Sequence, residues 1–200
     1  MGADVDQIHY DLREELHKSL HRKYCQKDEF LIVSGGKIER NKKTHLLMQA
    51  VADFQDVKLI VFGTVANDYK NDIEHSINDN VIMAGWKSPD EISDIFLGAD
   101  LAVFPGQHSV LWEQACACKL PCLFAKWSGM QYLNNGGNSA FIEDISVLGI
   151  KRQIIKYKRT KEYYEMDRIA KSEATGIYSY KNIADKSLEC YKDVMEKENR

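Results

Sequence analysis

No stretch of this sequence approaches the roughly 18 consecutive apolar residues of a membrane-spanning helix, and no signal peptide opens it. An excess of one charge is also lacking, because 27 basic and 30 acidic residues give a net charge of −3. We therefore expect no general attraction to nucleic acid or to anionic lipid. Instead, 200 residues that are 44% hydrophobic can bury one full core, and we expect a soluble cytoplasmic protein.

Cysteine follows no pattern of a disulfide framework, since five cysteines are an odd number. Cys116 and Cys118 fall in an apolar helical segment and Cys122 in the strand after it. We expect all three to be small buried hydrophobes in a reducing cytoplasm. A Cys-x-Cys zinc site would need further ligands, and we find no Cys or His pair at metal spacing to supply them. We therefore expect no metal.

Two signatures of nucleotide binding are missing as well. The sequence holds neither the Gly-x-Gly-x-x-Gly fingerprint nor the Walker pattern with its Gly-Lys-Ser/Thr. The pair Gly35-Gly36 by itself is typical of a tight turn after a strand. A dinucleotide or a P-loop site is thus not indicated, and any nucleotide site must be argued from other residues.

Short apolar runs alternate with helical segments along the chain. The runs show no polar alternation, which indicates strands buried on both faces of a parallel sheet; they lie at 30–33, 57–62, 81–84, 101–104, 122–125 and, more weakly, 140–142. The helices are predicted at 45–54, 68–77, 89–97, 110–118 and 130–134, the third with Ser88 as N-cap before Pro89. This order predicts an α/β fold with a doubly wound, Rossmann-like parallel sheet and C-terminal helices.

Three parts of the chain differ in composition. Residues 1–28 are polar, with one amphipathic helical stretch around Leu12, Leu16 and Leu20. We expect the Rossmann-like domain over 29–145 and, over 146–200, two or three helices packed on the same domain, the last one beginning near Ser179 or Tyr180. The basic run 151–159 is typical of a solvated helix face; contact with the inner face of a membrane is the alternative.

Each predicted strand ends in a glycine or another small residue. In open α/β sheets ligands bind outside the carboxyl ends of the strands. The candidate site therefore combines the residues that follow Val33, Phe62, Ala84, Phe104 and Ala125. The glycines among them that we expect against a ligand are Gly36, Gly63 and Gly129.

The loop after the fourth strand carries the most chemistry. A helix opening at Ser109 presents unpaired N–H groups to an anion, and Glu113, one turn further, can accept hydrogen bonds from sugar hydroxyls. Phosphate and ribose together suggest a nucleotide-linked ligand. The plain alternatives are a Glu113 on the surface or paired in the core, and a His108 that only packs in its loop. Trp112 is expected in the core.

In its order of motifs the chain resembles the C-terminal, nucleotide-sugar-binding domain of the retaining "group 1" glycosyltransferases with two Rossmann domains, the GT-B fold. The resemblance covers nearly the whole chain and rests on several stretches. They are Gly36-Lys37 with Lys42-Lys43 and Leu46-Leu47, Val61-Phe62-Gly63, Gly85-Trp86, Ala99-Asp100, Glu113-Gln-Ala-Cys-Ala-Cys-Lys-Leu-Pro121, Gly136-Gly-Asn138 and Ser179-Tyr180 with Ile183-Ala184 and Tyr191. The sequence of His108–Gln114 most resembles the corresponding stretch of bacterial capsular and surface-polysaccharide transferases.

The resemblance implies catalytic roles for three residues. Lys37 stands where the family has a phosphate-binding Arg, and Lys42 matches its phosphate-binding Lys, so both would stabilise the departing diphosphate. Lysine offers a point charge in place of the arginine fork. Glu113 matches the second glutamate of the family's pair and would hold the ribose hydroxyls. Pro105 occupies the place of the first glutamate, which leaves the donor sugar open.

The resemblance also implies the remaining contacts. His108, Ser109 and the Val110 N–H would lie against the phosphates or the donor sugar, and Gln107 and His108 are the substitutes for the missing glutamate. Trp86 and Lys87 would frame the base through main-chain atoms. No cofactor and no essential metal are implied; a nucleoside-diphosphate sugar, of which a UDP-sugar is the expected one, is the donor substrate.

The implied reaction moves a hexose to an acceptor hydroxyl, on a glycan or a lipid-linked acceptor, for surface or capsular polysaccharide. The acceptor would be held by an N-terminal domain that this chain lacks. Met1-Gly-Ala-Asp4 resembles the family's interdomain segment, so we expect a fragment that binds donor and turns over little. The alternative is a non-catalytic nucleotide-binding or interaction module with a degenerate site. A GT-B epimerase or phosphorylase ranks last, because no cofactor lysine motif is found.

Overall fold

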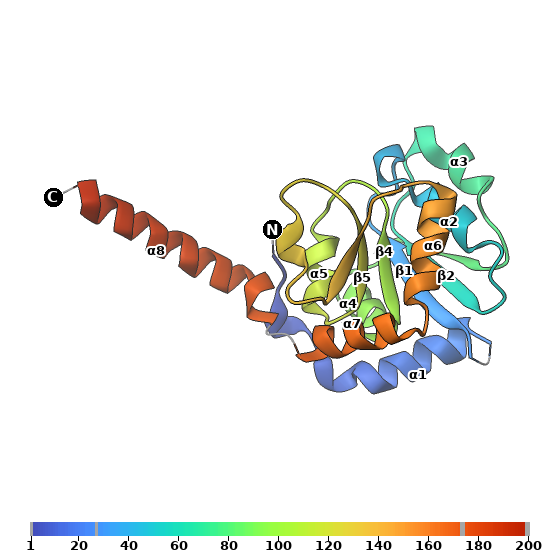
Figure 1. Ribbon diagram of the computed structural model, residues 1–200, viewed down its shortest axis with the longest axis horizontal. Coiled ribbons are helices and arrows are strands. Elements are labelled where there is room, and N and C mark those ends of the chain that lie inside the picture. The colour runs from blue at the N-terminus through green and yellow to red at the C-terminus, as the bar shows by residue number, and fades with distance from the viewer. Residues whose placement is uncertain (1, 27, 173–174, 199–200) are drawn as a thin grey trace.

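The computed structural model describes residues 2–26, 28–172 and 175–198 and shows one parallel sheet with helices on both faces (Figure 1). Each run that the sequence predicts as a strand forms one. The strands are β1 (Phe30–Gly35), β2 (Val57–Phe62), β3 (Val81–Gly85), β4 (Leu101–Phe104), β5 (Cys122–Ala125) and β6 (Ser139–Ile142). The predicted α/β, Rossmann-like fold is thus confirmed.

Eight α-helices accompany these strands in the described residues. They are α1 (Arg13–Tyr24), α2 (Thr44–Val51), α3 (Lys70–Glu74), α4 (Pro89–Gly98), α5 (Leu111–Ala117), α6 (Val147–Tyr157), α7 (Lys161–Ser172) and α8 (Tyr180–Glu198). Short 3-10 turns stand at Val5–Gln7, Tyr10–Leu12, Arg40–Lys42, Asn67–Tyr69, Gln131–Leu133 and Thr175–Tyr178.

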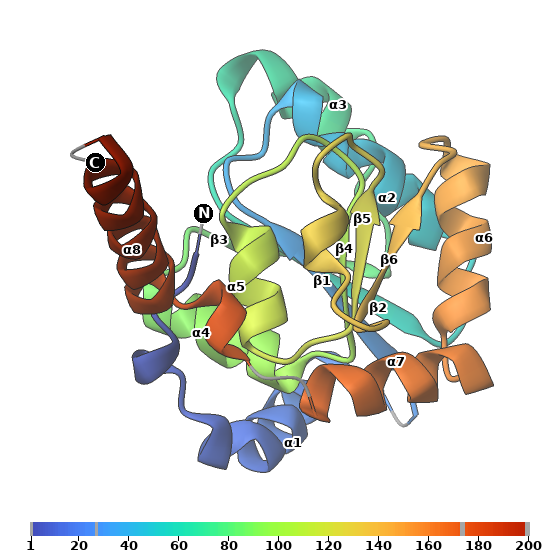
Figure 2. The same cartoon turned by 60° about the vertical axis from the view of Figure 1, so that its left-hand side comes forward.

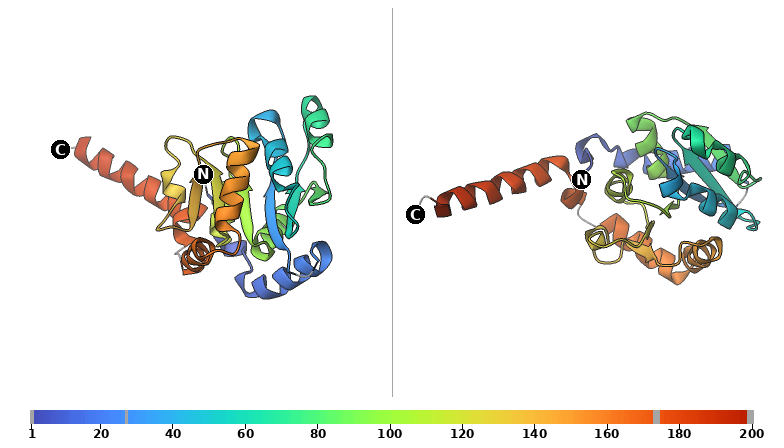
Figure 3. Two further views of the ribbon diagram at one scale, coloured as in Figure 1. Left: turned by 45° about the vertical axis from the view of Figure 1, so that its right-hand side comes forward. Right: turned by 90° about the horizontal axis from the view of Figure 1, so that it is seen from above.

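The alternation of side chains along each strand divides the core into two layers. In β1, Leu31 and Val33 face one layer, while Phe30 and Ile32 face the other. The first layer is covered by α1, α4 and α5, and the second by α2, α3, α6 and α7 (Figure 3). Because both faces are covered, the strands have no polar face, which explains the continuous apolar runs in the sequence.

The strand order is β3-β2-β1-β4-β5-β6. The chain winds outward from β1 in one direction to β3, and β4 then starts on the other side of β1. Between β1 and β4 the connections diverge to opposite sides, which is the topological switch point where open α/β sheets bind their ligands. The sheet therefore places the candidate site beyond the carboxyl ends of β1 and β4.

Helix ends follow local chemistry that the sequence shows. Ser88 caps α4 in a capping box: its side chain accepts from Glu91 N at 3.3 Å, and Glu91 Oε2 accepts from Ser88 N at 2.8 Å. Several predicted helices are shorter than expected, two of them markedly. The segment 68–77 forms a 3-10 turn followed by α3, and 130–134 holds only the 3-10 turn Gln131–Leu133.

The leading segment docks through the predicted amphipathic stretch, since Leu16 and Leu20 of α1 pack against the first core layer. Residue Ala3 lies beside the start of the last helix, because Ala3 N donates to Tyr178 O at 2.6 Å and Tyr180 N donates to Ala3 O at 3.0 Å. Figure 2 shows this N-terminal end beside the base of α8. The first and last described segments thus meet on one side of the domain.

The sequence predicts that all the C-terminal helices pack on the domain, but one of them does not. The helices α6 and α7 do, but α8 begins at Tyr180 as predicted and then extends away from the sheet (Figure 1). Leu188, for example, is 58% exposed, so this apolar side chain of α8 is not buried against the body. No helix among the described residues has the length and apolar character that crossing a membrane requires.

Two lysines of the basic run 151–159 form ion pairs with nearby carboxylates. Lys151 Nζ lies 2.6 Å from Asp53 Oδ2, and Lys158 Nζ lies 2.5 Å from Asp56 Oδ1. Both carboxylates belong to the turn before β2. The positive charge of this face is therefore balanced locally, in line with a solvated helix face.

Candidate functional site

A cleft of about 470 Å³ opens at the carboxyl edge of the sheet, beside the switch point. Four of the five predicted strand-end loops contribute to it. Its walls are Gly36, Lys37, Glu39, Lys42, Phe62, Gly63, Thr64, Trp86, Lys87, Ile92, Ser109, Val110 and Leu111. The structure thus brings together eight of the twelve residues that the sequence singled out.

The floor of the cleft is a contact between two backbones. A Cβ placed on Gly63 would lie 1.8 Å from Gly36 O, a distance at which no side chain fits. Gly63 also has φ +118°, and Gly36 has φ +108°, in the region that glycine alone adopts readily. The loops after β1 and β2 can approach this closely only because residue 63 is a glycine, whereas a Cβ on Gly36 would instead meet Leu111 Cδ1 at 2.8 Å.

Lys42 ties the loop after β1 to the loop after β4. Its Nζ donates to Gln107 O at 2.8 Å and to His108 O at 2.9 Å. The two loops also touch at the backbone, since a Cβ on Gly106 would lie 2.3 Å from the carbonyl carbon of Lys42. Burial lowers the pKa of Lys42, while the nearby Glu39 raises it. The ammonium therefore holds one wall of the cleft in shape.

The other cations stand at the rim. Lys37 is paired with Glu39 at 3.0 Å and its side chain is 73% exposed, while Lys87 is paired with Glu91 at 2.9 Å. Lys37 lowers the pKa of the Glu39 carboxyl. Trp86 beside them is 69% exposed. An exposed indole next to lysines can stack on a base or a sugar ring without any rearrangement of the core.

The helix that follows β4 starts later than predicted. α5 begins at Leu111, and Ser109 and Val110 form a turn before it, in which Ser109 O accepts from Trp112 N at 3.0 Å. Definitions of helix ends differ by one or two residues, and the turn still borders the cleft. Trp112 is buried, as predicted, and stacks on Phe124 with ring centroids 4.5 Å apart.

Glu113 is fully buried beneath this turn, outside the cleft wall. His108 Nε2 lies 3.0 and 3.1 Å from its two carboxylate oxygens, and Tyr132 OH donates to Oε1 at 2.5 Å. Burial and the hydrogen bond to Glu113 raise the pKa of Tyr132. The carboxylate thus has the core partners that the sequence analysis had kept as its plain alternative.

Gln107, His108 and Gly129 also lie outside the cleft wall. The side chain of Gln107 accepts from Asn41 Nδ2 at 2.8 Å, and His108 packs edge-on against Trp112. Gly129 has φ +83° with open space where its side chain would be, in the loop between β5 and β6. From this loop Trp127 donates its ring N–H to Gly106 O at 3.1 Å.

Sequence reasoning missed two groups of residues. Tyr132 carries no signal, because its contact with Glu113 depends on the path of the β5–β6 loop. His17 and His21 do carry one: they stand four residues apart on a helix, one turn on the same face. The structure places both beside Asp100, at the opposite edge of the sheet from the cleft.

The family model "Glycosyl transferases group 1" matches residues 17–174. The chain belongs to this family. The group 1 resemblance predicted from Lys42, Glu113 and their neighbours is therefore confirmed, as is the Rossmann-like architecture shared with GT-B glycosyltransferases.

Individual relatives are distant. A lipopolysaccharide 1,2-N-acetylglucosaminetransferase of Salmonella typhimurium is 26% identical over 190 residues, or 85% of this chain and 50% of the relative. The structure of Anabaena HepE with UDP-glucose is 18% identical with a TM-score of 0.77, over 96% of this chain and 56% of that one. The chain thus spans about half the length of these relatives.

One solved structure matches over its full length. It is the C-terminal domain of a group 1 glycosyltransferase, LpcC of Francisella tularensis, at 18% identity and a TM-score of 0.70, covering 90% of this chain and 100% of that domain. At such identities the likeness shows the fold. The two chains therefore share their fold.

Proposed function

We propose that the cleft binds the diphosphate and base of a nucleotide sugar, a UDP-sugar, and that the domain is the donor half of a retaining glycosyltransferase. The single observation that carries this proposal is the convergence of Lys37, Lys42, the turn at Ser109 and the exposed Trp86 at the switch point. HepE, which shares this fold, has been solved with UDP and with UDP-glucose. Family membership supports the same reading.

The cleft supplies what the departure of a diphosphate needs. In the transfer, the bond between the anomeric carbon and the diphosphate oxygen breaks, a bond from that carbon to the acceptor oxygen forms, and the proton of the acceptor hydroxyl passes to the departing diphosphate. Negative charge grows on the diphosphate, which Lys37 and Lys42 would stabilise. Lys42 is already held by two carbonyl oxygens, so its position is fixed before the donor arrives.

Glu113 needs a change in partners to serve as ribose acceptor. The Tyr132 hydroxyl occupies the oxygen that a ribose hydroxyl would use. We therefore propose that the β5–β6 loop moves when donor binds, so that ribose replaces Tyr132 on the carboxylate. His108 stays on Glu113 and holds the carboxylate in orientation.

The acceptor side is proposed from family alone. We propose a hexosyltransferase that needs no metal and acts on a glycan or lipid-linked acceptor for a surface polysaccharide, on the cytoplasmic side of the membrane. The Salmonella relative, named for a lipopolysaccharide sugar transfer, supports this class of acceptor. The acceptor would lie on a second domain, so the domain alone is expected to bind donor and to transfer little.

The test is calorimetric titration of this chain with UDP, GDP, ADP and uridine. The proposal expects UDP to bind and uridine to bind at least tenfold more weakly, since the diphosphate contacts are lost. Lys42→Met should weaken UDP about tenfold to hundredfold, as loss of a charged hydrogen bond of about 1.5–3 kcal/mol implies. Lys161→Met, an exposed cation on α7 outside the cleft, is the matched control and should change nothing.

Equal affinity for UDP and uridine, or equal loss in Lys42→Met and Lys161→Met, would contradict a diphosphate site in the cleft. Normal UDP binding with no transfer from any donor by the whole protein would favour the non-catalytic alternative instead.

A further inference from the structure

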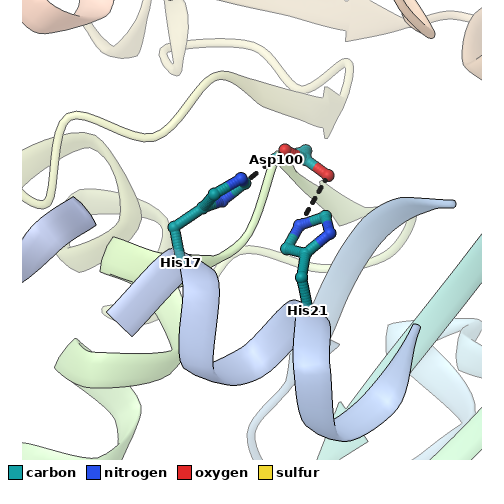
Figure 4. A group of neighbouring side chains, drawn as sticks. All are labelled: His17, His21 and Asp100. Carbon is teal, nitrogen blue, oxygen red and sulfur yellow. Dashed lines mark ion pairs between the residues drawn. The ribbon is translucent and has the colours of Figure 1, made fainter. Parts of the chain in front are cut away.

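A second cluster of polar side chains lies at the amino edge of the sheet, away from the donor cleft. It forms because α1 approaches the end of α4 closely: a Cβ on Gly98 would lie 2.5 Å from Leu20 Cδ1 and 2.9 Å from Leu16 O. This approach brings one face of α1 over the residues that lead into β4. His17 and His21, one turn apart on that face, then point towards Asp100 (Figure 4).

The three side chains present their donor atoms to one another. His21 Nε2 lies 3.2 Å from Asp100 Oδ2, and His17 Nδ1 lies 3.9 Å from Asp100 Oδ1. One donor atom from each residue lies within 4.8 Å of the other two. Figure 4 shows both imidazole rings pointing from α1 towards the carboxylate.

Two details show that the cluster is incompletely satisfied and already oriented. His21 Nε2 is buried and, among the described residues, has no hydrogen-bond partner. Asp100 Oδ2 accepts from Leu31 N at 2.7 Å, which fixes the carboxylate. A buried nitrogen that makes no hydrogen bond and lies 3.2 Å from a fixed carboxylate is an arrangement that a bound cation would complete.

We propose that His17, His21 and Asp100 bind a divalent transition-metal ion of the zinc type, which fastens α1 to the entrance of β4. Two imidazoles and one carboxylate are ligands that such ions prefer. With metal–ligand bonds of about 2.0–2.2 Å, tetrahedral ligand atoms stand about 3.4 Å apart. The observed 3.2 and 3.9 Å approach this spacing. His17 Nδ1 also lies 3.1 Å from Gly98 O, so this nitrogen has to give up that carbonyl to bind the ion.

The ion can reach the His17, His21 and Asp100 cluster from solvent, but it has to displace a proton to bind there. His17 and Asp100 line a cleft of about 350 Å³ that opens to solvent and leaves room for water as the remaining ligand. The Asp100 carboxylate raises the pKa of His21 to about 9, so a metal ion has to displace a proton from this ring. The ion has no part in sugar transfer, because Asp100 precedes β4 and the donor cleft lies beyond the opposite ends of the strands.

The experiment is a zinc titration of the metal-free chain, followed by melting temperature and by calorimetry. At a hundredfold excess over its dissociation constant, Zn²⁺ should raise the Tm by about 5–10 °C. His17→Ala and His21→Ala should each weaken zinc binding about a hundredfold. Asp100→Asn keeps an oxygen for the Leu31 N–H but loses the charge, and it should weaken binding about tenfold. His75→Ala, an exposed histidine on the other side of the domain, is the control and should bind zinc unchanged.

Cobalt gives an independent readout that folding defects do not mimic. Co²⁺ should produce visible d–d bands in the wild-type chain that are lost in His21→Ala. An ion-paired cluster alone, with no zinc-dependent rise in Tm and no cobalt bands, would overturn the proposal. So would zinc binding that survives both histidine changes but is lost in Cys25→Ser, since the ion would then sit on the thiol next to the cluster. UDP binding is expected to be the same with and without zinc, so a failure of this proposal is distinguishable from a failure of the donor site.

Discussion

Among the glycine-to-alanine changes, Gly63→Ala is expected to lower the stability of the fold most, because its added Cβ would make the closest contact. The new Cβ would lie 1.8 Å from Gly36 O, whereas real Cβ atoms essentially never come under 3.0 Å, so the two loops must separate by more than an ångström. The φ of +118° adds about 1–3 kcal/mol of backbone strain for any side chain. Separation also strains two hydrogen bonds, Gly36 N to Phe62 O at 3.0 Å and Gly63 N to Gly85 O at 2.7 Å, each worth about 1 kcal/mol.

The sum is about 3–5 kcal/mol of unfolding free energy, or a fall in Tm of about 6–20 °C for a chain of this size. Thermal unfolding followed by circular dichroism measures it. Gly136→Ala is the matched control, because Gly136 also has positive φ (+76°) but nothing within 4 Å of the added carbon. It should lose only the strain, about 1 kcal/mol. Equal losses in the two variants would refute the claim that close backbone contact builds the floor of the cleft.

Three further predictions test other parts of the structure. Tyr132→Phe removes the hydroxyl that donates to Glu113 and should lower the free energy of unfolding by about 1 kcal/mol. It should also tighten UDP binding about fivefold, because the group that competes with ribose is gone. Weaker UDP binding, measured by calorimetry, would mean that Tyr132 belongs to the donor site itself. Ser88→Ala removes the cap of α4 and should lower the Tm by about 2–4 °C, whereas an unchanged Tm would mean that the capping box contributes nothing. Burial raises the pKa of the Cys118 thiol to about 12, so iodoacetamide at pH 8 should modify Cys25 well before Cys118 by peptide mass spectrometry; similar rates would contradict the burial.

The sheet could be predicted because its determinants are local. Runs such as Val57–Phe62 are apolar throughout, and this alone indicates a strand covered on both faces. The cap at Ser88 is equally local. The path of α8 could not be predicted, because an amphipathic pattern does not tell whether a partner surface lies within the same domain.

Part of the donor cleft could be predicted from the sequence, because the order of the strands decides which loops meet. Lys42 and Ser109 follow strands whose carboxyl ends meet at one edge, so topology brings them together. The partners of Glu113 depend on where the β5–β6 loop puts Tyr132, nineteen residues away, and no sequence pattern encodes that path. His17 and Asp100 meet only because Gly98 lets two helices come close, which is a feature of packing between distant segments.

The most direct test of the central claim is a crystal structure of this chain with UDP. The account predicts the diphosphate within hydrogen-bond reach of Lys42 and the turn at Ser109, the base against Trp86, and the ribose on Glu113 in place of the Tyr132 hydroxyl. UDP bound elsewhere, with the Tyr132–Glu113 hydrogen bond intact and the cleft filled only by water, would contradict it.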